Sequence, residues 1–260
     1  MKNKGKFIPY YKLHLYDRNS FAPLLTGVGC PFNCSYCASK LLVAEYQRQP
    51  LNDVLLEIID LYTIGIRDFA FYDDALLVDS EEHIKPLLRS VADAKLDIRF
   101  HTPNGLHARF IDEELAQLIK ETNFKSIRLS LETVDQKRQE KTGGKVNNDD
   151  LEKTVKLLKR QGFTKNEIGV YLMYGLPGQD VLEVKEGINF LKRLDVRIYL
   201  TEFSPIRGTQ SWIELINKGI IHETLDPLIT NNTVFCYLYS DYDPDEIEAM
   251  RLDVKKYNVK

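Results

Sequence analysis

Three of the four cysteines in this chain lie within eight residues, at Cys30, Cys34 and Cys37. Three cysteines in so short a loop cannot connect distant parts of the chain, so they do not form a disulfide framework. Thiolates crowded into one loop are suitable ligands for a soft metal ion or an iron–sulfur cluster. Structural zinc sites prefer two separated ligand pairs, and no second Cys/His pair follows. Three thiolates on a four-iron cluster leave one iron open to a substrate or cofactor.

Short apolar runs alternate with segments of helical spacing along most of the chain. The pattern predicts strands at residues 22–28, 68–72, 96–101, 126–131, 168–174 and 196–203. It predicts intervening helices at residues 51–62, 80–94, 112–121, 149–161 and 180–194. Such alternation indicates parallel βαβ units of an α/β protein. Right-handed crossovers would roll six of these units into a partial (β/α)6 TIM-like barrel.

The 260 residues are expected to form one barrel domain with two attachments. We expect an N-terminal arm at residues 1–19, a core barrel at 20–209 and a C-terminal extension at 210–260 packed on the barrel. In the extension, residues 212–218 and 244–254 are predicted to be helical, with an irregular stretch between them.

Composition and charge exclude several classes of protein. The chain has no apolar run near the ~20 residues that cross a bilayer, and its start does not resemble a signal peptide. A net charge of −3 predicts no general affinity for nucleic acid or anionic membranes. Clustered cysteines favour a reducing compartment, so we expect the protein to be cytoplasmic.

The cysteine spacing, with Tyr36 directly before the third cysteine, resembles the signature of the radical S-adenosylmethionine (SAM) superfamily. The resemblance implies that Cys30, Cys34 and Cys37 hold a 4Fe-4S cluster and that the amino and carboxylate groups of SAM bind its fourth iron. It implies an enzyme that reductively cleaves SAM to a 5′-deoxyadenosyl radical, which acts on an unidentified substrate. The implied partners are SAM and an electron donor such as flavodoxin or ferredoxin.

The carboxyl ends of the strands should form the active face, as in other parallel barrels. After the second strand, Tyr72, Asp73 and Asp74 stand where the superfamily has Gly-Gly-Glu, a segment that binds the SAM amino group largely through its backbone. The alternative is that the two aspartates form only a strand-end turn and a helix cap.

Four further residues acquire cofactor-binding roles from the resemblance. Glu132 ends the fourth strand and would accept hydrogen bonds from the ribose hydroxyls. Lys145 lies near the position where the superfamily often has a basic residue that binds the SAM carboxylate, although a solvated surface lysine is an equal alternative. Gly175 belongs to a segment that packs along the adenine, and Pro205 to one whose backbone pairs with the adenine edge.

His101 and Asn104 also end a strand and have no implied role toward SAM. We expect both to face the cavity and consider them candidates for substrate contact, although a histidine at a strand end is more often structural. Cys236 lies far from the other cysteines and is expected to be a buried thiol, with a resolving or substrate-facing thiol as the alternative.

Residues 102–109 and 143–145 look most like radical SAM domains that follow a cobalamin-binding domain. Only 29 residues precede Cys30, whereas such a domain needs about 100, so we expect no cobalamin domain. Either a partner supplies cobalamin or, as we favour, it is not used. The alternative function is a non-catalytic iron–sulfur or zinc protein, such as an electron carrier or scaffold. A carrier usually supplies four cysteines per cluster, so three within one loop favour the enzyme.

Overall fold

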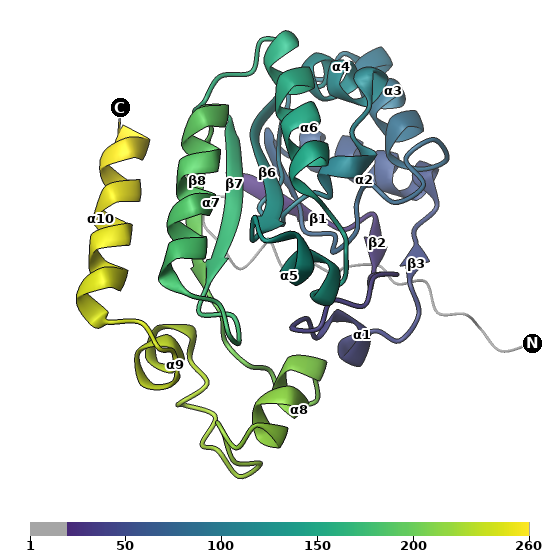
Figure 1. Cartoon of the computed structure of the whole chain (residues 1–260). Helices are drawn as coiled ribbons and strands as arrows, with labels where there is room; N and C mark the ends of the chain where they lie inside the picture. The colour runs from purple at the N-terminus through teal and green to yellow at the C-terminus, as the bar shows by residue number, and fades with distance from the viewer. Residues whose placement is uncertain (1–19, 260) are drawn as a thin grey trace, which may run out of the picture.

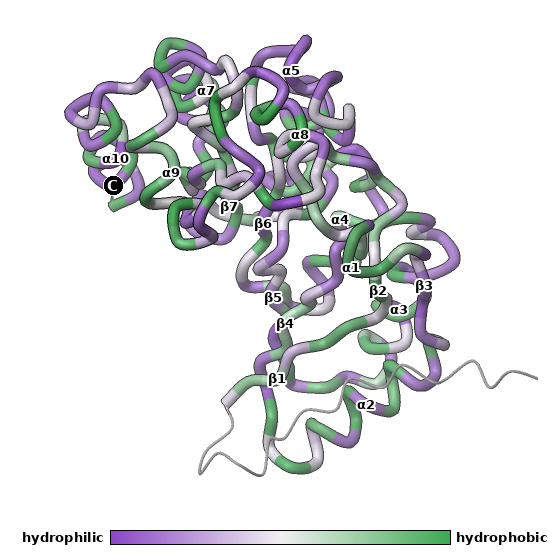
Figure 2. Tube along the Cα trace, turned by 90° about the horizontal axis from the view of Figure 1, so that it is seen from below, coloured by the Kyte–Doolittle hydropathy of each residue, from purple (hydrophilic) through white to green (hydrophobic). Residues whose placement is uncertain are grey.

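Six parallel strands form the centre of the computed structural model, which describes residues 20–259. In sheet order they are β1 (Phe21–Leu24), β4 (Asp68–Phe71), β5 (Arg99–His101), β6 (Phe124–Glu132), β7 (Ile168–Tyr174) and β8 (Arg197–Glu202). Figure 2 shows β1, β4, β5, β6 and β7 following one another in this order. The expected partial (β/α)6 barrel is confirmed, and the expected arm at residues 1–19 lies outside the described residues.

Helices cover one face of this sheet, which we call the outer face (Figure 1). They are α2 (Leu51–Thr63), α3 (Ile84–Ala94), α4 (Glu113–Glu121), α6 (Asn148–Arg160) and α7 (Val181–Leu194). Alternate strand residues such as Phe69, Phe71 and Leu172 are buried in the core beneath them. Gly187 lets α7 approach closely, because a Cβ there would lie 2.8 Å from the Leu172 side chain. The intervening strand residues therefore point to the opposite, inner face.

Side-chain caps explain where several of these helices begin. Asp112, Asn147 and Asp180 each accept a hydrogen bond from the backbone N–H three residues later, at the starts of α4, α6 and α7. Such caps satisfy amide groups that would otherwise lack partners. The helix expected from residue 80 instead begins at Ile84, because Asp79 has a positive φ of 45° and the residues after it form turns.

Several short elements were not expected from the sequence. They are the antiparallel pair β2 (Gly27–Val28) and β3 (Gln47–Arg48), the helices α1 (Ser39–Leu42), α5 (Gln136–Lys141) and α9 (Asn232–Tyr239), and the 3-10 helix η2 (Ala108–Phe110). The first strand was expected to reach residue 28 but ends at Leu24. Its extension is interrupted because the amide of Thr26 donates to the carboxylate of Asp73 instead of joining the parallel sheet.

Beyond β8 the chain forms α8 (Gln210–Asn217), α9 and α10 (Pro244–Val259). Figure 1 shows α10 beside β8, at the end of the sheet. The Asn258 side chain accepts from the amide of Ile198 at 3.0 Å and donates to its carbonyl oxygen at 2.8 Å. This pairing satisfies backbone groups on an edge strand that would otherwise be free to pair with another chain. Within the described residues, no helix has the length and apolar character needed to cross a membrane.

Candidate active site

The cysteine loop joins β2 to α1 at the carboxyl end of the sheet. Gly29, with φ of 78°, turns the chain out of β2, and the Cys37 amide donates to the Cys34 carbonyl at 3.1 Å. Two distant segments fasten the loop: the Ser35 amide donates to the Thr142 carbonyl at 3.3 Å, and the Ser35 carbonyl accepts from the Ser211 amide at 2.8 Å. The positions of the thiols therefore depend on α5 and α8 as well as on the local sequence.

Gly143, just after α5, packs directly against Cys34. A Cβ at position 143 would lie 3.0 Å from Cα and 3.2 Å from Sγ of Cys34, and the backbone φ is 126°. A side chain at this position would be strained and would also displace the cysteine. The close approach brings the segment that carries Lys145 over the cysteine loop.

The three cysteines line one pocket of about 400 Å³. This volume lies within the usual range for small-molecule sites. The residues around it come from the cysteine loop and from the carboxyl ends of β4 to β8: Cys30, Cys34, Tyr36, Cys37, Ser39, Asp74, Pro103, Asn104, Gly105, His107, Ser130, Lys145, Tyr171 and Thr201. The structure thus brings together seven of the residues predicted from the sequence.

The donor set fits a cluster better than a single metal ion. Within residues 20–259, no group of three His, Cys, Asp or Glu side chains is arranged to hold one ion. In a cubane cluster each cysteine binds a different iron, so the thiolates need not converge on one point. Three thiols around one pocket satisfy that requirement.

The charges beside the thiols also suit metal-bound thiolates. Burial raises the pKa of the Cys34 thiol to about 11, and the nearby Lys145 ammonium acts in the opposite direction. Burial also raises the pKa of Cys30. A bound metal keeps such thiols deprotonated, and the ammonium group would add to the stabilisation of their negative charge.

Lys145 and Glu132 form an ion pair, and both side chains are largely buried. Burial alone would lower the pKa of Lys145, but Glu132 and Cys34 more than compensate, so its pKa is raised. Arg109 holds this segment by donating from Nε to the Lys145 carbonyl at 2.5 Å. The alternative of a solvated surface lysine is therefore wrong, and two residues expected to bind different parts of SAM contact each other.

Tyr36 lies beside this pair, with its ring 5.8 Å from the Lys145 ammonium. Burial and the neighbouring Glu132 carboxylate raise its pKa well above the usual value. Its hydroxyl is buried and lacks a hydrogen-bond partner in the described part of the chain. A buried hydroxyl of this kind is a suitable contact for a bound polar molecule.

Asp73 and Asp74 have different surroundings. Asp74 lines the pocket, whereas the buried Asp73 carboxylate accepts from the amide and hydroxyl of Thr26, at 3.0 and 2.6 Å. His83 Nε2 lies 2.7 Å from that hydroxyl and donates to it, because the hydroxyl proton is directed to Asp73. Asp73 therefore anchors the base of the cysteine loop through its side chain, and only its backbone remains near the site.

Asn104 lines the pocket and orients its neighbours. Its side-chain amide donates to the carbonyl oxygens of Tyr72 and Asp73, at 2.8 and 3.3 Å. These carbonyls belong to the segment expected to bind the SAM amino group through its backbone. Asn104 thus has a positioning contact that the sequence did not indicate.

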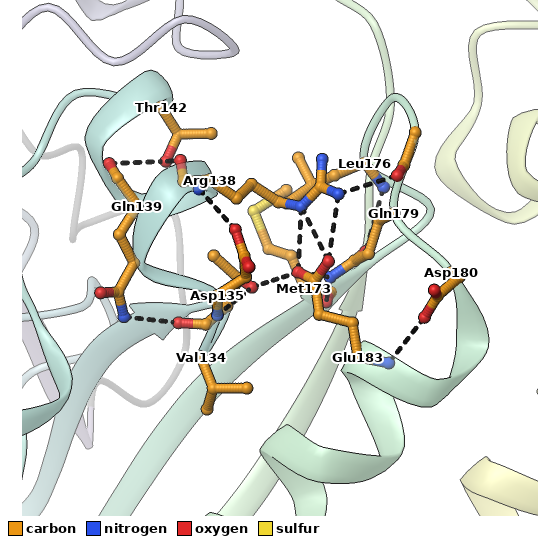
Figure 3. Close-up of polar contacts among 12 residues, drawn as sticks. Val134, Asp135, Arg138, Gln139, Thr142, Met173, Leu176, Gln179, Asp180 and Glu183 are labelled. Atoms are coloured by element: carbon orange, nitrogen blue, oxygen red, sulfur yellow. Dashed lines mark hydrogen bonds and ion pairs between the residues drawn. The ribbon is translucent and has the colours of Figure 1, made fainter.

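Arg138 of α5 clamps the turn between β7 and α7 (Figure 3). It donates to both carboxylate oxygens of Glu183 at 2.9 and 3.1 Å and to the carbonyls of Pro177 and Gly178 at 2.9 and 2.8 Å. Gln179, in the same turn, donates to the Met173 carbonyl at 3.3 Å. A forked guanidinium can satisfy carboxylate and carbonyl acceptors together, so this turn is held in one conformation.

Besides Tyr72, Asp73 and Glu132, three further predicted residues do not line the pocket. Gly175 packs against the buried Cys236 thiol, and its positive φ of 79° and the lack of space explain the glycine. Pro205 is buried behind the end of β8. His101 contacts Asp68 at 3.0 Å and Ser126 at 2.9 Å, so the expectation that it faces this cavity is wrong. Because β5 is short, its last residue lies level with the amino-terminal part of β6.

Sequence reasoning missed several residues around the pocket. Gly105 has no space for a side chain because Ser130 lies against it. His107 packs against Phe32 of the cysteine loop with the rings tilted and their centres 4.6 Å apart. Tyr171 donates from its hydroxyl to the Pro103 carbonyl at 2.7 Å. Strand alternation in β7 was the available signal for Tyr171, since it lies between the buried Val170 and Leu172.

Comparison with known proteins places these observations in a family context. The model of the Radical SAM superfamily matches residues 24–191. An uncharacterised methyltransferase of Pyrococcus horikoshii is 25% identical over 237 residues, which cover 85% of this chain and 50% of that protein. One from Synechocystis sp. is 28% identical over 143 residues, which cover 52% and 26% of the two chains. The chain therefore spans half or less of these relatives.

Solved structures resemble this chain in fold. The radical SAM methyltransferase TsrM from Kitasatospora setae gives a TM-score of 0.69 at 22% identity, covering 79% of this chain and 40% of that one. Methylornithine synthase (PylB) gives 0.59 at 15% identity, covering 92% and 62%. The expected partial barrel thus has structural counterparts.

Proposed function

Because the chain belongs to the radical SAM superfamily, as the sequence predicted, we propose that it reductively cleaves SAM to a 5′-deoxyadenosyl radical that acts on a further substrate. The superfamily is one of enzymes, and its cofactors are a 4Fe-4S cluster and SAM. The single observation that supports the proposal best is the shared pocket of Cys30, Cys34 and Cys37. Three thiols there leave one iron of a cubane for SAM.

The residues of this chain would bind and orient the reactants. Cys30, Cys34 and Cys37 would hold the cluster, which when bound supplies one electron to SAM. The carbonyls of Tyr72 and Asp73, oriented by Asn104, are acceptors suited to the ammonium group of SAM. Asp74 adds a carboxylate at the same wall. The electron would come from an external donor such as flavodoxin or ferredoxin.

Tyr36 and Lys145, with Glu132 paired to Lys145, would form a second, polar wall. Glu132 and Lys145 already neutralise each other, so they can accept and donate hydrogen bonds without adding net charge to the pocket. Burial of this wall excludes water, which strengthens electrostatic interactions inside and protects a reactive radical. The role of the protein is thus to position the reactants and shield them.

Methyl transfer is the second candidate outcome. Two relatives are named methyltransferases, and the TsrM structure is that of a radical SAM methyltransferase. Since the chain spans half or less of those two relatives, the names support the outcome only as a proposal. Methyl transfer would produce S-adenosylhomocysteine, whereas radical formation produces 5′-deoxyadenosine, so the two products distinguish the steps.

Anaerobic reconstitution tests the proposal directly. The protein is incubated with iron and sulfide, bound iron is measured, and dithionite and SAM are then added while both nucleoside products are quantified. We expect about four irons per chain and 5′-deoxyadenosine from the wild type. Cys34→Ala should lose both, whereas the matched control Cys236→Ala, which alters a buried thiol outside the pocket, should retain both. Zinc uptake, or a cluster that never cleaves SAM, would instead support the non-catalytic alternative.

A further inference from the structure

The inner face of the sheet below the cysteine pocket is polar and carries several arginines. Strand alternation places Arg128, Gly169 and Arg197 on this face in adjacent positions of β6, β7 and β8. The interior of a complete TIM barrel is usually filled by branched apolar side chains. Charged side chains here indicate that this part of the interior does not serve as a packed core.

Arg128 lies over an aromatic ring and has no counterion among residues 20–259. Its guanidinium carbon is 4.4 Å from the centre of the Tyr199 ring. Gly169 makes this arrangement possible, because a Cβ there would lie 2.5 Å from the Tyr199 ring and 3.0 Å from the Arg128 stem. Tyr199 in turn packs against Tyr171, with ring centres 5.7 Å apart. Since Tyr171 lines the cysteine pocket, the arginine layer lies next to the proposed site of SAM.

Arg197 is the less satisfied of the two arginines. Its Nε atom is buried and has no hydrogen-bond partner among residues 20–259. Neither Arg197 nor Arg128 forms an ion pair in the described part of the chain. A partly buried cation without a counterion is destabilising, so such groups are normally paired or bind a ligand.

The remaining inner-face charges do not compensate these two. Asp68 lies at the amino end of β4 and is already shared by Arg99, at 2.5 Å, and His101, at 3.0 Å. Glu202 belongs to the other face of β8, where it pairs with Arg251 of α10. Two positive charges are thus left beside an aromatic surface.

We propose that the substrate of this enzyme is a small anionic molecule whose carboxylate or phosphate group binds between Arg128 and Arg197. The inference rests on the proposed function, since it concerns the molecule that the radical attacks. Guanidinium groups bind carboxylate and phosphate in a forked geometry, and Cα atoms two strands apart lie about 10 Å from each other, which lets two arginines converge on one anion. The Tyr171 and Tyr199 rings would contact the rest of the substrate and direct it toward the cysteine pocket.

Calorimetric titration of the reconstituted protein with SAM present tests this assignment. The probes are benzoate, phenyl phosphate and neutral benzamide, which share a ring and differ in charge. We expect one equivalent of at least one anion to bind roughly 10- to 100-fold more tightly than benzamide. Arg128→Met and Arg197→Met should remove that preference, whereas Arg193→Met, a change of an exposed arginine on α7, should not. The two anions distinguish a carboxylate site from a phosphate site.

Stability without ligand provides a second readout. Because the buried Nε atom of Arg197 has no hydrogen-bond partner and its side chain no ion pair in the described part of the chain, Arg197→Met should leave the unfolding midpoint unchanged or raise it, whereas loss of a purely structural arginine would lower it. A lowered midpoint, equal binding of benzoate and benzamide, no binding of either anion, or displacement of the anion by SAM would overturn the assignment. None of these measurements requires SAM cleavage, so failure of the proposed function would be seen separately, in the 5′-deoxyadenosine assay.

Discussion

Replacement of Gly143 by alanine should damage the cluster site although position 143 is not a ligand. The added Cβ would lie 3.0 Å from Cα, 3.2 Å from Sγ and 3.3 Å from N of Cys34. Two of these atoms belong to a backbone that is hydrogen-bonded on both sides of Ser35, so the loop cannot easily move. A side chain at φ of 126° costs about 1–3 kcal/mol, and crowding adds about 1–3 kcal/mol. We therefore expect a loss of about 2–6 kcal/mol in the free energy of unfolding.

Gly144→Ala is the matched control for this experiment. Its φ of 58° is one that an L residue can adopt, and no atom lies within 4 Å of its Cβ position, so the cost should be only about 1–2 kcal/mol. Urea unfolding of the metal-free protein and iron content after reconstitution would be measured for both variants. Gly143→Ala should bind less than roughly half the iron of Gly144→Ala, since displaced ligands weaken metal binding. Equal stability and equal iron content in the two variants would refute the reasoning.

Three further substitutions test individual contacts by urea unfolding. Lys145→Met should lower the free energy of unfolding by about 3–5 kcal/mol, because it leaves the buried Glu132 carboxylate unpaired. Adding Glu132→Gln should recover most of that loss, and no recovery in the double variant would contradict the ion pair. Arg138→Met should lower the free energy of unfolding by a similar amount, because it releases the turn after β7. An unchanged free energy of unfolding would show that the Arg138 contacts do not hold this turn. Burial raises the pKa of Asp73 to about 6 and lowers that of His83 to about 4. As pH rises from 4 to 6.5, the raised pKa of Asp73 reduces the free energy of unfolding and the lowered pKa of His83 increases it. Asp73→Asn removes the Asp73 contribution, so the free energy of unfolding of this variant should increase by about 2–3 kcal/mol between pH 4 and 6.5. A free energy of unfolding that does not change with pH over this range would contradict the prediction.

Most of the fold could be predicted because its signals are local. Apolar runs and helical spacing identified the six strands and the five outer helices within a few residues, since both patterns recur at fixed intervals. Helix α5 was missed because its six residues, Gln136–Lys141, are all polar and give no periodicity. The shortened β1 was missed for a different reason: the competing contact of Thr26 with Asp73 spans 47 residues.

The site was predictable to the extent that its residues are close in sequence. The three cysteines and Tyr36 lie in one loop, so their spacing was sufficient to place them around one pocket. The pairing of Lys145 with Glu132, and the turn of Asp73 toward Thr26, depend on contacts between segments, which spacing does not reveal. The prediction that His101 faces the cavity was wrong because it assumed that all strands end at the same height in the sheet. β5 instead ends beside the amino-terminal part of β6.

The segment from α5 to Lys145 connects the separate parts of the site. Arg138 holds the turn after β7, the Thr142 carbonyl receives the Ser35 amide, Gly143 packs on Cys34 and Lys145 completes the polar wall. Four contacts of one short segment thus hold the turn after β7, the cysteine loop with one ligand of the proposed cluster, and the side of the pocket that Lys145 lines. A helix rotates side chains by about 100° per residue. Inserting one residue within α5 would therefore change the orientation of Arg138 relative to Gly143, so that Arg138 could no longer contact the turn after β7 while Gly143 contacts Cys34. Such an insertion should therefore reduce both iron binding and the stability of the turn, although it changes no ligand.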